Sequence, residues 1–219
     1  MTDVEHETLP SDEPRTWWRR NRWWLLVLPL SIALALAASG YRVRTFWWEE
    51  GQHRELARSK PGEFVRVVDD FEDALGPTRR TYSVRAAARE LSALPEGVGR
   101  LEALPDGASP WQVDLELKAR PDQDLNYCLV TLVDDQGRRY GGDVPDLLSQ
   151  ANLCVPDEHP GPATPLGPGA RRGEVAPGAE RPESWSVQRV VLVPKGIEPT
   201  SVRIVFSPPD YVVLPLPGK

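Results

Sequence analysis

The longest apolar segment of the chain runs from Trp23 to Tyr41 without a charged side chain. At 1.5 Å per residue this stretch makes about 28 Å of α-helix, close to the roughly 30 Å hydrocarbon core of a bilayer. Pro29 lies near the start of the segment, where a membrane helix tolerates proline. The pattern therefore predicts a transmembrane helix over residues 23–41, surrounded by the lipid bilayer.

Aromatic side chains flank this segment on both sides. Such rings favour the headgroup level of a membrane, so two aromatic clusters that bracket an apolar helix indicate two membrane interfaces. The residues expected at these interfaces are Trp17, Trp18, Trp23 and Trp24 on one side and Tyr41, Trp47 and Trp48 on the other.

Charge sets the orientation of the predicted helix. Residues 15–22 carry four arginines and no acid, whereas the arginines that follow the helix are diluted by glutamates. Because basic flanks tend to stay in the cytoplasm, the N-terminal side is expected there. The predicted organisation is a disordered cytoplasmic tail over 1–22, the helix, a juxtamembrane neck over 42–61 and an extracytoplasmic domain over 62–219.

A cleavable signal peptide is the competing interpretation. The basic start, the apolar stretch and the small residues Ala35 and Ala37, spaced as in a cleavage site, support it. Cleavage would leave a secreted binding protein with the second aromatic cluster exposed to water. That cluster and the length of the apolar run favour a retained anchor, and both interpretations place residues 45–219 outside the cytoplasm.

A second pattern, the alternation of apolar and polar residues, marks the rest of the chain. In residues 111–119 this alternation places one face in a core and the other in water. Residues 127–133 are apolar on both faces and predict a central strand, and the turn residues 134–137 lead into a return strand. Further strands are expected over 64–68, 81–84, 185–193, 201–206 and 211–216, and the helical spacing of apolar residues from 84 to 94 predicts a short helical turn.

Seven or eight short strands at intervals of about 8–12 residues, with no long amphipathic helix, predict an antiparallel β-sandwich. The expected fold class is therefore mainly β, with an N-terminal transmembrane helix before the sandwich. The residues expected in its core are Trp111, Leu115, Leu117, Leu129, Val191, Val193, Ile204 and Phe206.

The chain has two cysteines, Cys128 and Cys154. Outside the cytoplasm an even count favours a disulfide, which would close a loop of about 26 residues and stabilise the domain by roughly 3.5 kcal/mol on a chain-entropy estimate. Metal binding is the alternative. The chain lacks a CxxC spacing, and the histidine nearest to either cysteine is His159.

Seven prolines and five glycines fall between Cys154 and Pro182. This composition predicts a long surface loop over residues 155–182, attached at its start by the disulfide. A loop of this length inside a compact domain is either functional or loose.

Candidate chemistry is sparse. The net charge of −6 gives no reason to expect nucleic acid as a partner, and no GxSxG motif accompanies the three histidines. Asp157, Glu158 and His159, or Asp134 and Asp135 with Asp143 and Asp146, could bind a metal, but neither run has calcium-loop spacing. The paired arginines at 138–139 and 171–172 could meet anionic polymers or lipid headgroups. Solvated side chains are the favoured interpretation of all these groups, so neither a cofactor nor a metal is expected.

The strand pair around Asp134, Gly137 and Tyr140, written D-x-x-G-x-x-Y, and the later strand pair from Pro194 to Ile204 carry a resemblance. Together they resemble the immunoglobulin-like extracytoplasmic domains of unknown function in bacterial single-pass membrane proteins and lipoproteins. The resemblance covers residues 111–215 and implies an immunoglobulin-like sandwich. It implies no active-site residues, and the long Pro/Gly-rich loop departs from it.

These patterns lead to one expected function and three alternatives. The expected function is that of a membrane-anchored, non-catalytic interaction module that presents its loops to an envelope protein or polymer. The alternatives are an exported enzyme or metal-binding protein that uses Asp157, Glu158 and His159, a secreted binding protein after cleavage, and an accessory subunit that interacts through its Trp-rich helix.

Overall fold

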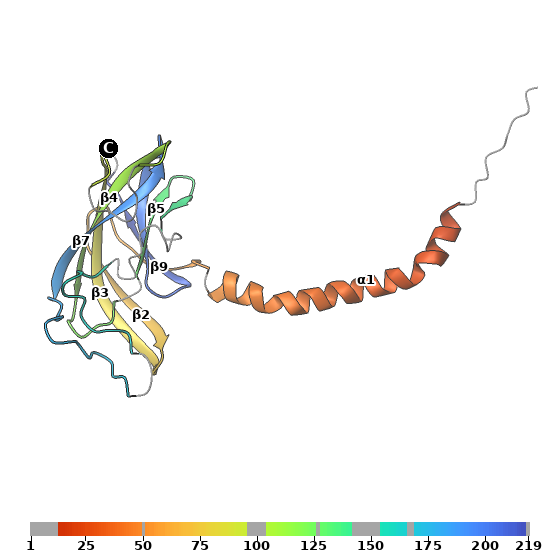
Figure 1. Ribbon diagram of the computed structural model, residues 1–219, viewed down its shortest axis with the longest axis horizontal. Coiled ribbons are helices and arrows are strands. Elements are labelled where there is room, and N and C mark those ends of the chain that lie inside the picture. The colour runs from red at the N-terminus through yellow and green to blue at the C-terminus, as the bar shows by residue number, and fades with distance from the viewer. Residues whose placement is uncertain are drawn as a thin grey trace, which may run out of the picture. The chain divides into compact units, whose positions relative to one another are not determined.

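The computed structural model describes residues 13–49, 51–95, 104–125, 128–141, 154–165 and 169–217. The chain divides into two compact units, residues 1–50 with a long helix and residues 51–219 with the β-strands (Figure 1). The second unit makes the protein mainly β.

Helix α1 runs from Glu13 to Val43 and continues as a π-helical turn, Arg44–Glu49. Among the described residues, one helical stretch is long and apolar enough to cross a membrane: Arg19–Val43, with a mean hydropathy of 1.8. Its serine hydroxyls are satisfied within the helix, because Ser31 donates to the Val27 carbonyl at 2.9 Å and Ser39 donates to the Ala35 carbonyl at 2.6 Å. Such internal bonding suits a helix without access to water.

The helix begins before the apolar run, which corrects the expected tail. Residues 13–22 are helical rather than disordered. Extending an existing helix by one residue costs less than starting a new one, so the apolar run extends its helix through the arginines and tryptophans that precede it. Residues 1–12 lie outside the described part of the chain.

The strands of the second unit form two sheets. In the five-stranded sheet the order is β1-β9-β8-β5-β6, and in the four-stranded sheet it is β2-β3-β4-β7. Neighbouring strands are antiparallel except for β1 and β9, which are parallel. The strands are β1 Arg54–Arg58, β2 Val65–Asp73, β3 Gly76–Glu90, β4 Ala108–Ala119, β5 Leu129–Asp134, β6 Arg139–Tyr140, β7 Ser184–Pro194, β8 Pro199–Val205 and β9 Asp210–Pro215.

One apolar core joins the two sheets. Leu115 and Leu117 of β4 belong to the same buried cluster as Ile204 of β8 and Leu214 of β9. Seven of the eight predicted core residues are buried: Trp111, Leu115, Leu117, Val191, Val193, Ile204 and Phe206. The eighth, Leu129, is only partly buried, because it points to the face of β5 away from this cluster.

Two predicted elements are wrong. Part of the predicted neck is strand β1, which pairs with β9 at the edge of the five-stranded sheet. The predicted helical turn after residue 84 is a continuation of β3, which pairs with β2 on one side and with β4 on the other. Pairing on both sides outweighs the helical preference of three consecutive alanines, because strand formation depends on context more than on intrinsic propensity.

Candidate binding surface

The segment from Cys154 to Pro182 contains no helix or strand in its described residues, 154–165 and 169–182. This agrees with the predicted loop. Contacts at its start, its end and its middle hold the segment against the sheets.

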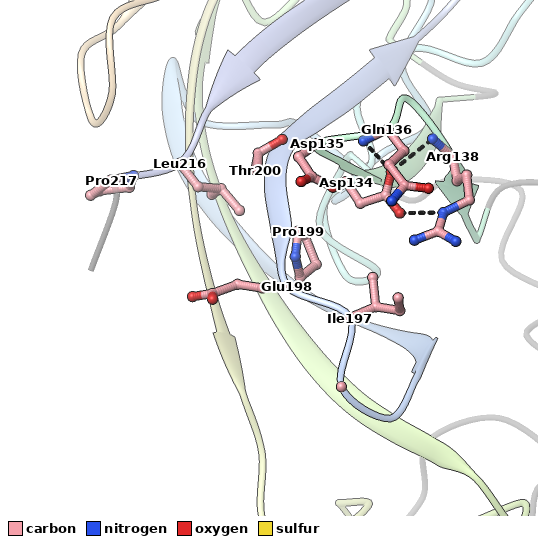
Figure 2. A pocket seen from close by; sticks show the side chains of 11 residues that line it. Asp134, Asp135, Gln136, Arg138, Ile197, Glu198, Pro199, Thr200, Leu216 and Pro217 are labelled. Carbon is pink, nitrogen blue, oxygen red and sulfur yellow. Dashed lines mark hydrogen bonds and ion pairs between the residues drawn. The ribbon is translucent and has the colours of Figure 1, made fainter.

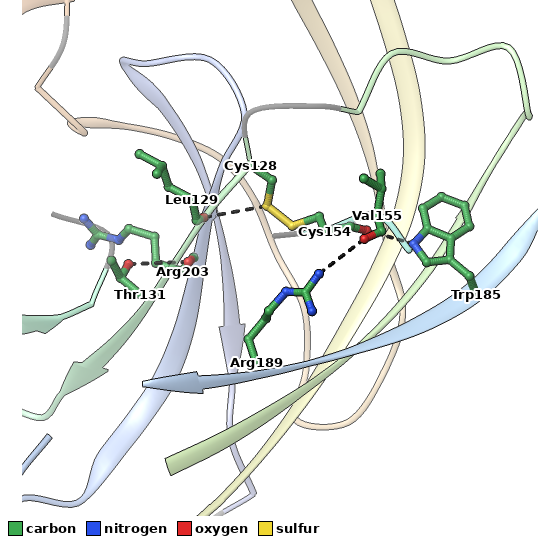
Figure 3. The surroundings of a disulfide bond; sticks show 8 residues. All are labelled: Cys128, Leu129, Thr131, Cys154, Val155, Trp185, Arg189 and Arg203. Atoms are coloured by element: carbon green, nitrogen blue, oxygen red, sulfur yellow. Dashed lines mark hydrogen bonds between the residues drawn. A yellow bond between two sulfur atoms is a disulfide. The ribbon is translucent and has the colours of Figure 1, made fainter. Parts of the chain in front are cut away.

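A disulfide fixes the start of the segment. It joins Cys154 to Cys128, which directly precedes β5, with the two Cα atoms 5.7 Å apart, a usual separation for a disulfide. The Trp185 indole donates to the Cys154 carbonyl at 2.8 Å, and Arg189 donates to the Val155 carbonyl at 3.3 Å. Figure 3 shows both side chains reaching from β7 toward this backbone. The first two residues of the loop are thus buried against the domain.

Arg181 fixes the other end of the segment. Its side chain is almost fully buried, stacks on the Trp185 ring at 4.6 Å and donates to three backbone carbonyls. These bonds reach Pro160 at 2.9 Å within the loop, and Arg120 at 3.3 Å and Gln123 at 2.7 Å in the segment after β4. Burial lowers the pKa of Arg181 to about 10, although Asp124 and Asp122 oppose this, so the guanidinium stays charged at neutral pH.

The backbone of Gly161 lies against the Arg181 side chain. Its φ of +82° lies in the left-handed region that favours glycine, and an added Cβ would lie 2.9 Å from an Arg181 nitrogen. The glycine therefore permits the loop backbone to lie on the buried guanidinium.

The middle of the segment contacts the β2–β3 hairpin. Arg172 makes two bonds of 2.8 Å to the Asp73 carboxylate and one of 2.7 Å to the Gly76 carbonyl. Hydrogen bonding from Arg172 lowers the pKa of Asp73 despite its desolvation. Thr164 donates to Asp124 at 2.7 Å. Between these contacts lies a pocket of about 170 Å³ whose lining includes Arg79, Arg120, Asp122 and Pro165.

The candidate metal or catalytic residues lie on this segment without forming a cluster. The Asp157 side chain is 84% exposed and lies 3.9 Å from Arg189, and His159 Nδ1 lies 3.1 Å from the Gly178 carbonyl. Glu158 is exposed. Within the described residues, no three His, Cys, Asp or Glu side chains are placed to hold a metal. Asp143 and Asp146 lie outside those residues.

A larger pocket, of about 570 Å³, lies between the β5–β6 turn, the β7–β8 turn and the end of β9 (Figure 2). At its rim the buried Asp134 accepts hydrogen bonds from the Gln136 and Arg138 backbone amides, both at 2.9 Å. It also accepts bonds from Arg138 Nε at 2.6 Å and from the Tyr140 hydroxyl at 2.8 Å. Burial by itself would raise the pKa of Asp134, but these bonds outweigh it and lower the pKa to about 2. The D-x-x-G-x-x-Y motif is therefore a turn held by one carboxylate.

Sequence reasoning missed three charged residues that organise the domain: Arg181, Asp69 and Arg80. Asp69 and Arg80 form a buried ion pair of 2.7 Å, and Arg80 stacks on Phe71 at 3.7 Å. Alternation offered a signal for this pair, since Asp69 lies on the same strand face as Val67, and Arg80 on the same face as Tyr82. For Arg181 the sequence offered none, because it lies in an irregular segment.

The paired arginines at 138–139 and 171–172 do not share their partners. Arg138 and Arg172 each bind a carboxylate, that of Asp134 and that of Asp73 respectively. Arg139 instead donates to the Gln52 side-chain oxygen at 2.9 Å. A pair of adjacent arginines therefore does not act as one basic unit at either position.

Comparison with protein-family models, curated proteins and solved structures found no match to this chain.

Proposed function

We propose that the protein is a single-pass membrane protein with a non-catalytic interaction domain outside the cytoplasm. Residues 1–22 lie on the cytoplasmic side and residues 23–41 span the bilayer. Residues 62–219 form the domain, together with strand β1. The domain binds an envelope protein or polymer through the surface of the segment 154–182.

The anchor is supported by the apolar stretch Arg19–Val43 and by its internally bonded serines. The aromatic residues at its two ends are exposed, as expected for side chains that meet a membrane interface: Trp17, Trp23, Trp24, Tyr41, Trp47 and Trp48. The disulfide supports an oxidising compartment for the second unit.

The strand order supports an immunoglobulin-like sandwich. Immunoglobulin constant-type domains pair strands as A-B-E-D in one sheet and C-F-G in the other. If β4, β5, β7, β8 and β9 correspond to strands B, C, E, F and G, the pairings B–E, C–F and F–G are all present. Strand β3 then takes the place of A beside B. The disulfide departs from this scheme, because in antibody domains it joins strands B and F.

One observation carries the proposed interaction: an irregular segment is ordered by specific contacts at both ends and in its middle. The disulfide, Arg172 and Arg181 hold it at three separate places. Loops on a rigid scaffold are the usual sites of recognition, and a loop that is already ordered loses less conformational entropy on binding. The exposed charges on this segment, which include Arg171 and Glu174, are available for contact.

Charge reversal on the segment tests this proposal. The variant carries Arg171→Glu and Glu174→Lys, which keeps the net charge and avoids every residue that anchors the segment. The matched control carries Glu63→Lys and Arg66→Glu, an exposed pair of the same spacing before and within β2. After cross-linking of the full-length protein in cells, we expect a specific partner to be lost from the first variant and retained by the control. Equal recovery of that partner from both variants would remove the segment from the proposal.

Membrane fractionation tests the anchor separately. The mature chain is expected to stay with membranes after an alkaline carbonate wash, to keep its original N-terminus and to expose residues after 51 to protease only from outside the cytoplasm. A new N-terminus beyond Ala37 would replace the anchored protein with a secreted one. Protease access only from the cytoplasmic side would contradict the orientation.

A further inference from the structure

The outer face of the five-stranded sheet, the face away from the shared core, carries an unusual arrangement of charge. Residues alternate along each strand, so the neighbours of the core residues Leu132, Ile204 and Val212 point outward. Outward residues are Thr131 and Val133 on β5, Arg203 and Val205 on β8, and Tyr211 and Val213 on β9. Several of them are nearly inaccessible although they lie outside the core: Thr131 2%, Val133 6%, Val205 1% and Val213 4% exposed.

Arg203 is the central cation of this face. Its guanidinium stacks on the Tyr211 ring at 4.0 Å, which fixes the orientation of the charged plane. The buried Nε has no hydrogen-bond partner, and no carboxylate pairs with the guanidinium within the described residues. Burial lowers the pKa of Arg203, and so do the positive charges of Arg139 and Arg58, although Tyr211 and Glu55 oppose them. In Figure 3 this guanidinium points away from the disulfide and Trp185.

Arg139 is the second cation. It lies on β6 directly opposite Val133, and Arg203 lies on β8 directly opposite Thr131, so both arginines project from the outer face, one on each side of β5. Among the residues that the structure describes, it donates to the neutral Gln52 side chain. Arg58, the third arginine nearby, is different because Glu55 binds it with bonds of 2.8 and 2.6 Å.

Several other described arginines of the sheets bind a carboxylate, whereas Arg89 of β3 binds the neutral Gln112 side chain at 3.2 Å. Each of the following pairs joins an arginine to a carboxylate: Arg54–Asp210, Arg79–Asp70, Arg80–Asp69, Arg85–Glu116 and Arg138–Asp134. Arg139 and Arg203 differ from these pairs, because within the described residues neither binds a carboxylate, and Glu55, the acid that acts on Arg203, is bound to Arg58. Like charges on one face repel, and an anion bound by both guanidinium groups would reduce that repulsion.

We propose that Arg139 and Arg203 form a binding site for a phosphate-bearing anion on the outer face of the five-stranded sheet. A guanidinium donates through a planar fork that matches phosphate oxygens, and a tetrahedral phosphate offers enough oxygens for two such forks. A carboxylate presents only two oxygens, so a second guanidinium fork would have to share them with the first. The stacked Arg203 supplies the oriented, partly desolvated donor, and the exposed Arg139 closes the site from β6. This site is separate from the segment 154–182 and does not depend on the anchor.

Arginine labelling on the full-length protein tests the site. In a non-ionic detergent, a dicarbonyl reagent modifies exposed guanidinium groups, and mass spectrometry gives the rate at each position. Inorganic phosphate is expected to slow modification of Arg139 in a saturable manner, compared with chloride at the same ionic strength. Arg66, an exposed arginine on β2, should be unaffected and serves as the internal control.

Two variants separate binding from folding. Arg203→Gln should raise the phosphate concentration that half-protects Arg139 by about tenfold or more, because a charge-assisted hydrogen bond is lost. Arg85→Gln, on the other sheet, should leave that concentration unchanged. Near-ultraviolet circular dichroism shows that each variant is folded. Unchanged protection in Arg203→Gln would overturn the proposal. So would a natural chain in which Arg139 is protected neither by phosphate in detergent nor by phosphatidylglycerol in nanodiscs.

Nanodiscs identify the source of the phosphate. If the ligand is a lipid headgroup, Arg139 should be protected in nanodiscs that contain phosphatidylglycerol, without added phosphate, and labelled freely in detergent. If the ligand is a soluble anion, protection should require added phosphate in both settings. Either result supports the site. Equal labelling of Arg139 in detergent, in nanodiscs and in phosphate would show that no such site exists.

Discussion

The sheets and the segment 154–182 reach order in different ways. In the sheets, side chains such as Leu115 and Ile204 are completely buried, and every strand is hydrogen-bonded to a neighbour. In the segment, the described backbone pairs with no strand and depends on one disulfide and on arginines that donate to carbonyls and carboxylates. Apolar burial is spread over many residues, whereas each polar anchor holds one place. A single substitution should therefore weaken the sheets as a whole but release the segment locally.

The largest effect is expected from Leu115→Ala. This side chain is 0% exposed and lies on β4, between β3 and β7. Its loss should lower the free energy of unfolding by about 4 kcal/mol, because apolar contacts disappear and a cavity remains. Urea unfolding followed by circular dichroism measures this. Val68→Ala, at a side chain that is 48% exposed, should change stability by less than about 0.5 kcal/mol. Equal effects of the two substitutions would contradict the described core.

Replacing both cysteines with serine should have the next largest effect. The disulfide spans a sequence separation of 26 residues, and its loss should cost up to about 3.5 kcal/mol in unfolding free energy on the chain-entropy estimate. Limited proteolysis should cut near residue 155 before it cuts within a strand. An unchanged urea midpoint in the presence and absence of a reducing agent would show that the bond contributes little to stability.

Arg181→Leu should release the segment while sparing the sheets. The Pro160 and Gln123 carbonyls lose their donor, while the Arg120 carbonyl keeps the Gln123 amide, and the two unsatisfied carbonyls cost about 2 kcal/mol in total. Hydrogen exchange should become faster in residues 154–182 and stay slow in β4. Arg171→Leu, at an exposed position, is the control and should leave both regions unchanged. Faster exchange throughout β4 would mean that Arg181 supports the core as well.

The smallest effect is a dependence of stability on pH at the β5–β6 turn. The pKa of Asp134 is lowered from 3.8 to about 2 in the folded protein. Its contribution is therefore fully present above pH 3.8 and is lost as the pH falls toward 2. Urea midpoints measured from pH 5 to pH 2 should fall less steeply in Asp134→Asn than in the natural chain. Asp135→Asn should keep the natural slope, since the exposed neighbour does not hold the turn.

Much of the fold could be predicted, because alternation is a local property of a strand. Residues 111–119 were predicted as a strand with one buried face, and β4 has Trp111, Val113, Leu115 and Leu117 in the core. The return strand after the turn at 134–137 is present as β6. Strand β1 was missed because its partner, β9, lies more than 150 residues away in the sequence. The five residues of β1, three of which are charged, show no alternation that would predict this pairing.

The candidate site was predicted only in outline. Proline and glycine content identified an irregular segment, and the cysteine count identified its attachment. The acidic residues Asp157 and Glu158 were candidate metal-binding or catalytic residues in the sequence, and both side chains are exposed. Arg181, which does more to hold the segment, could not be distinguished from other arginines, because burial of a charged side chain depends on which distant backbone groups surround it.

The sequence by itself determined which segments are helical or extended in most of the chain, and which strand faces are apolar, because these depend on residues a few positions apart. It also determined a helix of sufficient length and hydropathy to cross a membrane. Tertiary structure alone decided which arginines bind carboxylates, which one becomes a buried anchor, and which two lie on one sheet face without a bound carboxylate among the described residues. Charged side chains are long and can choose among several partners, so their roles follow from the spatial arrangement of distant strands rather than from their neighbours in the chain.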